Sequence, residues 1–351
     1  MTVHTSQKQA PVRPLVSMVM PIRNEAAFIE QSFSAIRAQS YPPDRIEIVV
    51  VDGGSTDGTI ELVRAFMARD PRIALLGGPD VNTPLAMNLG TAASSGSLVA
   101  KVDGHGWMNP KFIETAADVL ANDDRVGCVG GRIVPITETD VERANSYARF
   151  SRLGVGGGVY TAPDRLHTTD TVQCGVYRRS ALTDAGGFDP AMAYGEDEEL
   201  NHRVRSAGWT IVFHPGMQFH YRVRPSITSL FRQYLRYGRA RVAVVRKHPR
   251  FLRAKHAVPG FLALALIVAL LLLIADRTRL IGASVLAAYG LLVAAGATWL
   301  AVKHRFPKVH LIAASLLALH LGYGLGSLLG LLDIVTRPPR VAAEERANDR
   351  P

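Results

Sequence analysis

The chain has 351 residues, with 40 lysines and arginines against 30 aspartates and glutamates and a net charge of +10. This length suits one large globular domain with a smaller part beside it. The two cysteines, Cys128 and Cys174, are far apart and lack C-x-x-C spacing, which excludes a thiolate metal centre of that type and indicates a reducing compartment.

The positive charge is concentrated in one part of the chain. Residues 200–275 contain no Asp or Glu, while eleven arginines and lysines lie between Arg222 and Lys255. No nucleic-acid recognition motif accompanies them, so we expect no nucleic acid partner. A basic stretch directly before an apolar one is typical of a juxtamembrane surface that faces anionic headgroups, which makes membrane lipids the expected partner.

Three long apolar segments follow, at 257–275, 280–302 and 309–335. Each is long enough to cross about 30 Å of hydrocarbon as a helix, so we expect three transmembrane helices within 257–335. The N-terminus has a polar tail, residues 1–14, and no apolar leader. We therefore expect a multi-pass protein of the cell inner (plasma) membrane, with residues 15–221 as a cytoplasmic domain, 222–256 as a basic amphipathic segment and 336–351 as a polar tail.

The first 120 residues alternate between strand and helix patterns. Strands are predicted at 16–21, 46–51, 73–76 and 97–102, with helices over 24–40, after Thr59 and from Asn82 between them. This order predicts an α/β fold with a parallel sheet. The loop after the first strand lacks G-x-G-x-x-G, and no G-x-x-x-x-G-K-[ST] occurs, which excludes the common dinucleotide and P-loop sites.

Later elements are less regular. Strands are predicted at 128–135, 172–177 and 211–214, helices at 180–185 and 197–207, and the glycine cluster 154–158 is expected to form a mobile loop.

Acidic side chains stand at three ends of predicted elements. Asp52 ends the apolar strand 46–51, Asp103 ends the strand 97–102 and is followed by Gly104 and His105, and Glu196 to Glu199 begin a helix. Ligands of open α/β sheets bind outside the carboxyl ends of the strands. A nucleotide contact, a metal anchor and a general base are what the transfer of a sugar from a nucleotide diphosphate to a hydroxyl requires.

Residues 16–249 resemble the inverting family 2 glycosyltransferases of GT-A fold, and most of all the membrane-bound enzymes of succinoglycan-type exopolysaccharide pathways. The resemblance rests on six motifs in the family's order: VSMVMPIRNE, VVVDGGSTDGT, AKVDGHG, QCGVYRRSAL, GEDEELNHRVRSAGW and QYLRYGRAR. It implies a mixed, mostly parallel sheet flanked by helices, followed here by the transmembrane region.

The resemblance also implies roles for single residues. Pro21, Arg23, Glu25, Asp52 and Asp103 would bind the donor. Asp103 would begin the metal motif for Mn²⁺ or Mg²⁺. Asp197 would remove the proton from the acceptor hydroxyl, with Glu196 as the rival base.

Two positions depart from the family's pattern. The usual Asp-x-Asp is Asp103-Gly104-His105 here, so His105 is either a metal ligand or a group behind one; histidine suits Mn²⁺ better than Mg²⁺. Gly53 stands where many relatives have a second acid.

Gln233, Arg236 and Tyr237 match the Q-x-x-R-aromatic spacing of processive family members. They share one helix face, where an arginine could hold a phosphate and a tyrosine stack on a sugar. The other interpretation is a basic amphipathic helix lying on the membrane, and both can hold together.

In the last apolar segment, Gly322, Gly326 and Gly330 form one smooth face. This face would pack within the chain or against a second copy. Three crossings would place Arg337, Arg340, Arg346 and Arg350 outside the cell, against the positive-inside tendency, unless one segment is re-entrant.

We therefore predict a metal-dependent hexosyltransferase. It would move a sugar, with UDP-sugar as the expected donor, to a saccharide on polyprenyl diphosphate by an inverting single displacement. The alternatives are a processive polysaccharide synthase, a polyprenyl-phosphate glycosyltransferase and a non-catalytic membrane scaffold.

Overall fold

The computed structural model describes residues 13–154 and 164–336, which form two compact units. Of the described residues, the first unit contains 13–134, 164–190 and 200–221, and the second contains 135–154, 191–199 and 222–336. Residues 135–154 and 191–199 group with the C-terminal helices, and the predicted domain boundary after residue 221 stays a prediction. Nearly all of the predicted tails, and residues 155–158 of the predicted glycine loop, lie outside the described residues.

The first unit is built on a mixed sheet. Four neighbouring strands are parallel, and they are β3 (Ile73–Gly77), β2 (Ile46–Asp52), β1 (Val16–Ile22) and β4 (Leu98–Lys101). The order continues through β8 (Val176–Arg178), β6 (Val126–Ile136), β9 (Thr210–Arg222) and β5 (Gly106–Met108), and β7 (His167–Thr168) pairs with β9. Strands β4 and β8 are antiparallel, so the parallel half predicted from the sequence is completed by an antiparallel half.

The register of the central strands places the functional loops at one edge. β1 and β2 are apolar and almost wholly buried, as expected for parallel strands covered on both faces. Ile22 of β1 pairs with Asp52 of β2, so both strands end together. Helix α3 (Thr83–Ala92) leads from this edge, and the Asn82 side chain caps it by accepting a 3.0 Å hydrogen bond from the Leu85 backbone amide.

The remaining helices of the first unit cover the sheet and connect its strands. They are α1 (Ile29–Arg37), α2 (Thr59–Met67), α4 (Phe112–Asn122), α6 (Arg179–Asp184) and most of α7 (Glu196–Ser206).

Three elements differ from the sequence prediction. The predicted strand 172–177 is reduced to β8, because Cys174 has a φ of 50° and cannot continue an extended chain. Helix α1 begins at Ile29, because Asn24 has a φ of 57° and residues 24–28 form a turn. Strand β9 is far longer than the predicted 211–214.

The second unit is helical. It contains α5 (Asp140–Arg149), α8 (Ile227–Lys247), α9 (Ala254–Leu272), α10 (Arg279–Lys303) and α11 (Val309–Thr336), together with the first turn of α7. By length and composition, α10 and α11 are long and apolar enough to cross a membrane, whereas the apolar part of α9, His256–Leu272, is shorter. Two of the three predicted spans therefore have the expected helix, and the third crossing stays a prediction.

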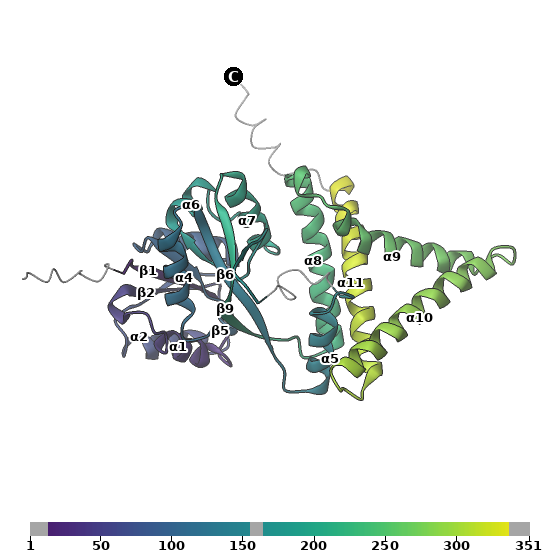
Figure 1. Ribbon diagram of the computed structural model, residues 1–351, viewed down its shortest axis with the longest axis horizontal. Helices are drawn as coiled ribbons and strands as arrows, with labels where there is room; N and C mark the ends of the chain where they lie inside the picture. The colour runs from purple at the N-terminus through teal and green to yellow at the C-terminus, as the bar shows by residue number, and fades with distance from the viewer. Residues whose placement is uncertain (1–12, 155–163, 337–351) are drawn as a thin grey trace, which may run out of the picture. The chain divides into compact units, whose positions relative to one another are not determined.

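A single apolar core joins these helices. Buried residues of α5, α8, α10 and α11 contact one another, including Ala144, Tyr234, Ala297 and Leu316. Helix α5 was not predicted from the sequence, and its capping box at Thr139 and Glu142 fixes its start. Helices α9 and α10 leave α11 and meet at a turn (Figure 1).

The glycine face of α11 packs against α8 of the same chain. A Cβ atom added to Gly322 would lie 2.7 Å from the Phe231 carbonyl oxygen, and one added to Gly326 would collide with the Leu235 carbonyl oxygen. The predicted alternative of an oligomer through this face is wrong, because α8 already occupies it.

Candidate active site

Asp52 organises the loop that follows β2. Its side chain is 9% exposed, and its carboxylate accepts hydrogen bonds from the backbone amides of Gly54 (2.8 Å) and Ser55 (3.0 Å). The chain passes so close to its neighbours here that a Cβ on Gly53 would lie 2.5 Å from the Val81 carbonyl oxygen. A second acid at position 53, usual in relatives, therefore has no room in this loop.

The loop after β1 is tied to the loop after β2. The Asn24 amide donates to the Ser55 hydroxyl at 2.9 Å, and the Thr56 amide donates back to the Asn24 side chain at 2.8 Å. The Glu25 amide donates to the Thr59 hydroxyl at 2.9 Å. Of the predicted donor residues, Pro21 and Asp52 therefore lie at the ends of β1 and β2, and Arg23 and Glu25 lie on the loop after β1, at the same sheet edge.

Asp103 lies just beyond β4 at the same edge. The Lys101 ammonium is 3.5 Å from its carboxylate, and the Cys174 thiol contacts its other oxygen at 3.4 Å. Burial alone would raise the pKa of Asp103, but the charges of Lys101 and His105 outweigh it and hold the pKa below its ordinary value. The side chain is therefore kept as an anion.

His105 is paired with Glu25 from the first loop. Its Nδ1 lies 3.0 Å from Glu25 Oε1. Burial would lower the pKa of His105, but the bond to Glu25 and the charge of Asp103 raise it to about 9. Gly104 makes the contact feasible, because a Cβ there would lie 2.9 Å from the Glu25 side chain. The structure thus brings together Glu25, Asp103 and His105.

Sequence reasoning missed two residues of this cluster. They are Lys101, whose side chain is only 3% exposed, and Cys174, which the sequence did not connect with the site. A lysine inside an otherwise apolar strand, two residues before an acid, is a signal that could have identified Lys101. Nothing in the sequence indicates the Cys174 contact, which depends on the bend at its positive φ.

Asp197 and Glu196 occupy the first turn of α7, in the second unit. Both side chains are partly exposed. Gly195, with a φ of 75°, turns the chain into the helix. The helix dipole stabilises acids at this position.

Helix α8 supplies cations to the next two acids. Glu198 forms a 2.5 Å ion pair with Arg241, which also donates to the Tyr323 hydroxyl at 3.0 Å. The fully buried Glu199 carboxylate lies 2.7 Å from Lys247 Nζ and 2.8 Å from His248 Nε2. Part of the basic segment expected to face lipid headgroups therefore binds the acidic turn.

Three other arginines of this region, Arg224, Arg232 and Arg236, line a pocket of about 180 Å³. The predicted residues Gln233, Arg236 and Tyr237 all line it, together with Tyr194, Arg224, Ser229 and Arg232. Among the described residues, none of its three arginines has a carboxylate within ion-pair distance. Arg236 donates to the Tyr194 hydroxyl at 3.0 Å, and Gln233 donates to the Tyr237 hydroxyl at 3.2 Å. Such a pocket is suited to an anion.

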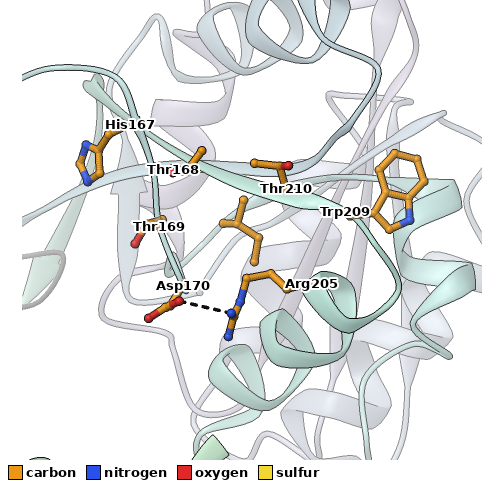
Figure 2. A pocket seen from close by; sticks show the side chains of 8 residues that line it. His167, Thr168, Thr169, Asp170, Arg205, Trp209 and Thr210 are labelled. Atoms are coloured by element: carbon orange, nitrogen blue, oxygen red, sulfur yellow. Dashed lines mark ion pairs between the residues drawn. The ribbon is translucent and has the colours of Figure 1, made fainter. Parts of the chain in front are cut away.

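A different, open depression of about 610 Å³ lies in the first unit. Figure 2 shows the Asp170 carboxylate turned toward the Arg205 guanidinium, at 3.2 Å, with Trp209 and Thr210 on the far side. It contains none of the predicted site residues, and its charged pair is already neutralised. We assign it no role in the reaction.

The comparisons with known proteins agree with this geometry. The sequence matches the glycosyl transferase family 2 pattern over residues 17–185 and that of glycosyl transferase family group 2 over residues 102–328. It is 30% identical to the succinoglycan biosynthesis protein ExoA of Rhizobium meliloti, over 91% of this chain and 96% of ExoA.

The chain belongs to glycosyltransferase family 2. It is also 23% identical, over 66% of its length and 74% of the relative's, to a glycosyltransferase of Methanococcus voltae. That relative is named a dolichyl N-acetyl-alpha-D-glucosaminyl phosphate 3-beta-D-2,3-diacetamido-2,3-dideoxy-beta-D-glucuronosyltransferase.

A solved structure has the same fold. The mannosyltransferase PcManGT from Pyrobaculum calidifontis, solved with GDP-Man and Mn²⁺, has a TM-score of 0.59 at 23% identity. The match covers 92% of this chain and 88% of that one. The predicted GT-A fold and glycosyltransferase activity are thus confirmed, and the apolar C-terminal helices agree with membrane association.

The residues present fit a divalent metal held mainly by substrate. No group of three or more metal-ligating side chains occurs within residues 13–154 and 164–336. Mg²⁺ commonly uses one or two protein carboxylates plus substrate phosphates, and Asp103, held as an anion, can supply one. The pairing with Glu25 raises the pKa of His105 and so favours its protonated form, and its role as a metal ligand stays a prediction.

Proposed function

We propose that this enzyme transfers a sugar from a nucleotide-diphosphate donor, with UDP-sugar as the expected donor, to a lipid-linked saccharide during cell-surface polysaccharide assembly. The succinoglycan relative and the dolichyl phosphate sugar transferase support an acceptor of this class. The observation that carries the proposal is that the acidic turn of Asp197 belongs to the same compact unit as the apolar helices. The proposed base would then belong to the unit that is anchored in the inner membrane, where the lipid-linked acceptor is also anchored.

The donor is assigned to the first unit. Asp52 holds its loop through two backbone amides, which leaves the loops after β1 and β2 fixed in shape before the donor binds. The paired Glu25 and His105 lie beside Asp103 and present a hydrogen-bonding, charged surface to the diphosphate. A bound Mn²⁺ or Mg²⁺ would be held by Asp103 and would neutralise charge on the diphosphate leaving group.

The general base is assigned to Asp197, with Glu196 as the rival. In a single displacement, the base accepts the proton of the acceptor hydroxyl while the hydroxyl oxygen bonds to the anomeric carbon and the bond to the diphosphate breaks. The configuration at that carbon is therefore inverted. Ion pairs hold Glu198 and Glu199 to α8, which fixes the backbone on the C-terminal side of Asp197.

The acceptor's diphosphate is assigned to the arginine pocket of α8. Arg224, Arg232 and Arg236 provide three guanidinium groups without a carboxylate partner among the described residues. Guanidinium groups form strong, charge-assisted hydrogen bonds to phosphate, and Tyr237 offers a ring for the attached sugar.

The test is transfer of radiolabelled sugar from uridine-, guanosine- and thymidine-diphosphate donors into the lipid fraction of membranes that contain the protein, with and without Mn²⁺. Label in a short lipid-linked product that requires metal supports the proposal and identifies the donor. The exposed-site variant Asp124→Asn serves as an active control, because Asp124 has a side chain that is 99% exposed.

Other products would favour the alternatives. Long polymer would favour a processive synthase, and transfer to polyprenyl phosphate without an attached saccharide would favour a polyprenyl-phosphate glycosyltransferase. No transfer with any donor, when lipid-linked saccharides are supplied, would favour the scaffold.

A further inference from the structure

We propose that α11 lies in the plane of the membrane surface beside α8 and does not cross the bilayer, while α9 and α10 cross it as a hairpin. The C-terminus would then remain on the side that carries the glycosyltransferase domain. This proposal rests on membrane association of the chain and not on the reaction assigned above.

The first observation is how closely α11 follows α8. Gly322, Gly326 and Gly330 face successive turns of α8, at Phe231, at Leu235 and at Arg239 with Val242. Gly238 of α8 meets α11 in return, because a Cβ there would collide with the Tyr323 carbonyl oxygen. The two backbones are therefore in contact over at least nine residues of α11, about 12 Å.

The second observation is the charge of α8 along the same turns. It carries a cation on nearly every turn, at Arg232, Arg236, Arg239, Arg241, Arg246 and Lys247. Charged side chains are unfavourable in hydrocarbon, and a basic amphipathic helix is typical of the interface. Arg232, Arg236, Arg239 and Arg241 lie along the turns of α8 that contact α11. If α11 crossed the bilayer, these four arginines would be drawn into the hydrocarbon with it.

The third observation is the charged partner at the end of α11. Asp333 accepts hydrogen bonds from the Arg239 guanidinium at 2.6 and 2.9 Å. Both groups are partly exposed, so the pair does not lie in the protein interior. Exposed charged groups are unfavourable in hydrocarbon, which favours the membrane interface for this end of α11.

The fourth observation is a difference between α11 and the hairpin in how many large apolar side chains are exposed. Over Val309–Ser327 of α11, Leu317 is the only large apolar side chain with substantial exposure, whereas the last turns of α11 expose Leu329, Leu331, Leu332 and Val335. Helices α9 and α10 instead expose large apolar side chains along their lengths, among them Phe261, Leu271, Leu280, Leu291 and Val302. Most of the exposed apolar surface therefore belongs to α9 and α10, and on α11 it is concentrated in the turns after Ser327.

The shape of the second unit agrees with this division. Helix α9 leaves α11 near Gly324, which packs against Pro259 and Ala263, and α10 returns at Leu316, which is near Gly296. Helices α9 and α10 are thus two legs that start and end on α11 (Figure 1). The apolar part of α9, His256–Leu272, is about 26 Å long and α10 is about 38 Å long, against a hydrocarbon thickness of about 30 Å.

The turn between the legs is charged. It contains Asp276 and Arg279, whose side chains are 93% and 64% exposed and 3.6 Å apart. Charged groups at a hairpin tip favour the far headgroup layer over the hydrocarbon. The arrangement also keeps the arginines of the tail after Thr336 on the domain side, in agreement with the positive-inside tendency.

The test is cysteine labelling with a membrane-impermeant maleimide in sealed vesicles of both orientations. Three variants are compared in the full chain: Asp124→Cys in the first unit, Asp276→Cys at the hairpin tip and Ala342→Cys in the tail. The native Cys128 and Cys174 are buried, so the unsubstituted protein gives the background. We expect Ala342→Cys to react from the same side as Asp124→Cys, and Asp276→Cys from the opposite side, each at least tenfold faster than from the other side.

Two results would overturn the proposal. Reaction of Ala342→Cys from the side of Asp276→Cys would mean that α11 crosses the bilayer. Reaction of Asp276→Cys from the side of Asp124→Cys would mean that the hairpin does not cross. Labelling does not require catalysis, so neither result can be confused with failure of the proposed function.

Discussion

Lys247, the last residue of α8, donates a 2.7 Å hydrogen bond to the fully buried carboxylate of Glu199, two residues beyond Asp197. His248 binds the same carboxylate oxygen at 2.8 Å. A buried acid with two such partners fixes the start of α7 to α8, and so fixes Asp197 within the second unit.

Replacing Glu199 with Gln should therefore loosen the turn that carries Asp197. The change removes the charge that Lys247 and His248 face, and we expect the unfolding free energy to fall by about 1–3 kcal/mol. Because the turn positions the proposed base, kcat should fall more than tenfold while KM for the donor stays within about twofold. Lys111→Met, an exposed lysine of the first unit, is the control. Loss of donor affinity alone would contradict a positioning role.

The packing of α11 on α8 predicts a matched pair of glycine variants. Gly326→Val would place its side chain against the Leu235 carbonyl, whereas Gly290→Val in α10 has open space around the added Cβ. Overpacking typically costs about 1–3 kcal/mol, so Gly326→Val should shorten the half-life of thermal inactivation in detergent while Gly290→Val leaves it unchanged. Equal half-lives would mean that the two helices do not pack as described.

The anion pocket predicts a selective effect on the lipid-linked acceptor. Arg232→Ala and Arg236→Ala each remove one guanidinium from a pocket that contains three. Charge-assisted hydrogen bonds contribute about 1.5–3 kcal/mol, so each variant should raise KM for the acceptor about tenfold or more and leave KM for the nucleotide sugar unchanged. The control is Arg246→Ala, on the same helix but outside the pocket. A raised KM for the donor instead would place the nucleotide at this pocket.

The contacts of Asp103 predict that its replacement weakens binding of the nucleotide donor. Asp103→Asn removes the anion that faces Lys101 and His105. We expect metal-dependent binding of nucleotide diphosphate, followed by calorimetry, to weaken at least tenfold, with the fold stable enough to give a normal melting transition. Asp124→Asn should bind as the unsubstituted protein does. Unchanged metal-dependent binding by Asp103→Asn would mean that Asp103 takes no part in donor binding.

Local sequence patterns were sufficient for the parallel strands and for the edge at which they end. The apolar run before Asp52 and the one before Asp103 identified their strands, because each is buried on both faces. Pairings between distant residues left no such pattern. The contact of Glu25 with His105, and those of Glu198 and Glu199 with α8, depend on how loops meet after folding.

The basic segment shows the same limit. Its charge density indicated a surface for lipid headgroups, but Arg239, Arg241 and Lys247 are paired with Asp333, Glu198 and Glu199. The number of basic residues in a segment does not show which of them form ion pairs within the protein. The grouping of residues 135–154 with the second unit was missed for a related reason, because the apolar face of α5 is short and its partner helices lie far along the sequence.

The measurement that tests the central claim most directly compares Asp197→Asn with Glu196→Gln. Single-turnover transfer to the lipid-linked acceptor and donor binding are measured on the same samples. If Asp197 is the base, its amide variant should lose about 10²–10⁴-fold in transfer rate and bind the donor normally, while Glu196→Gln keeps most of its rate. Normal transfer by Asp197→Asn would contradict the account, and loss in Glu196→Gln alone would give the base to Glu196.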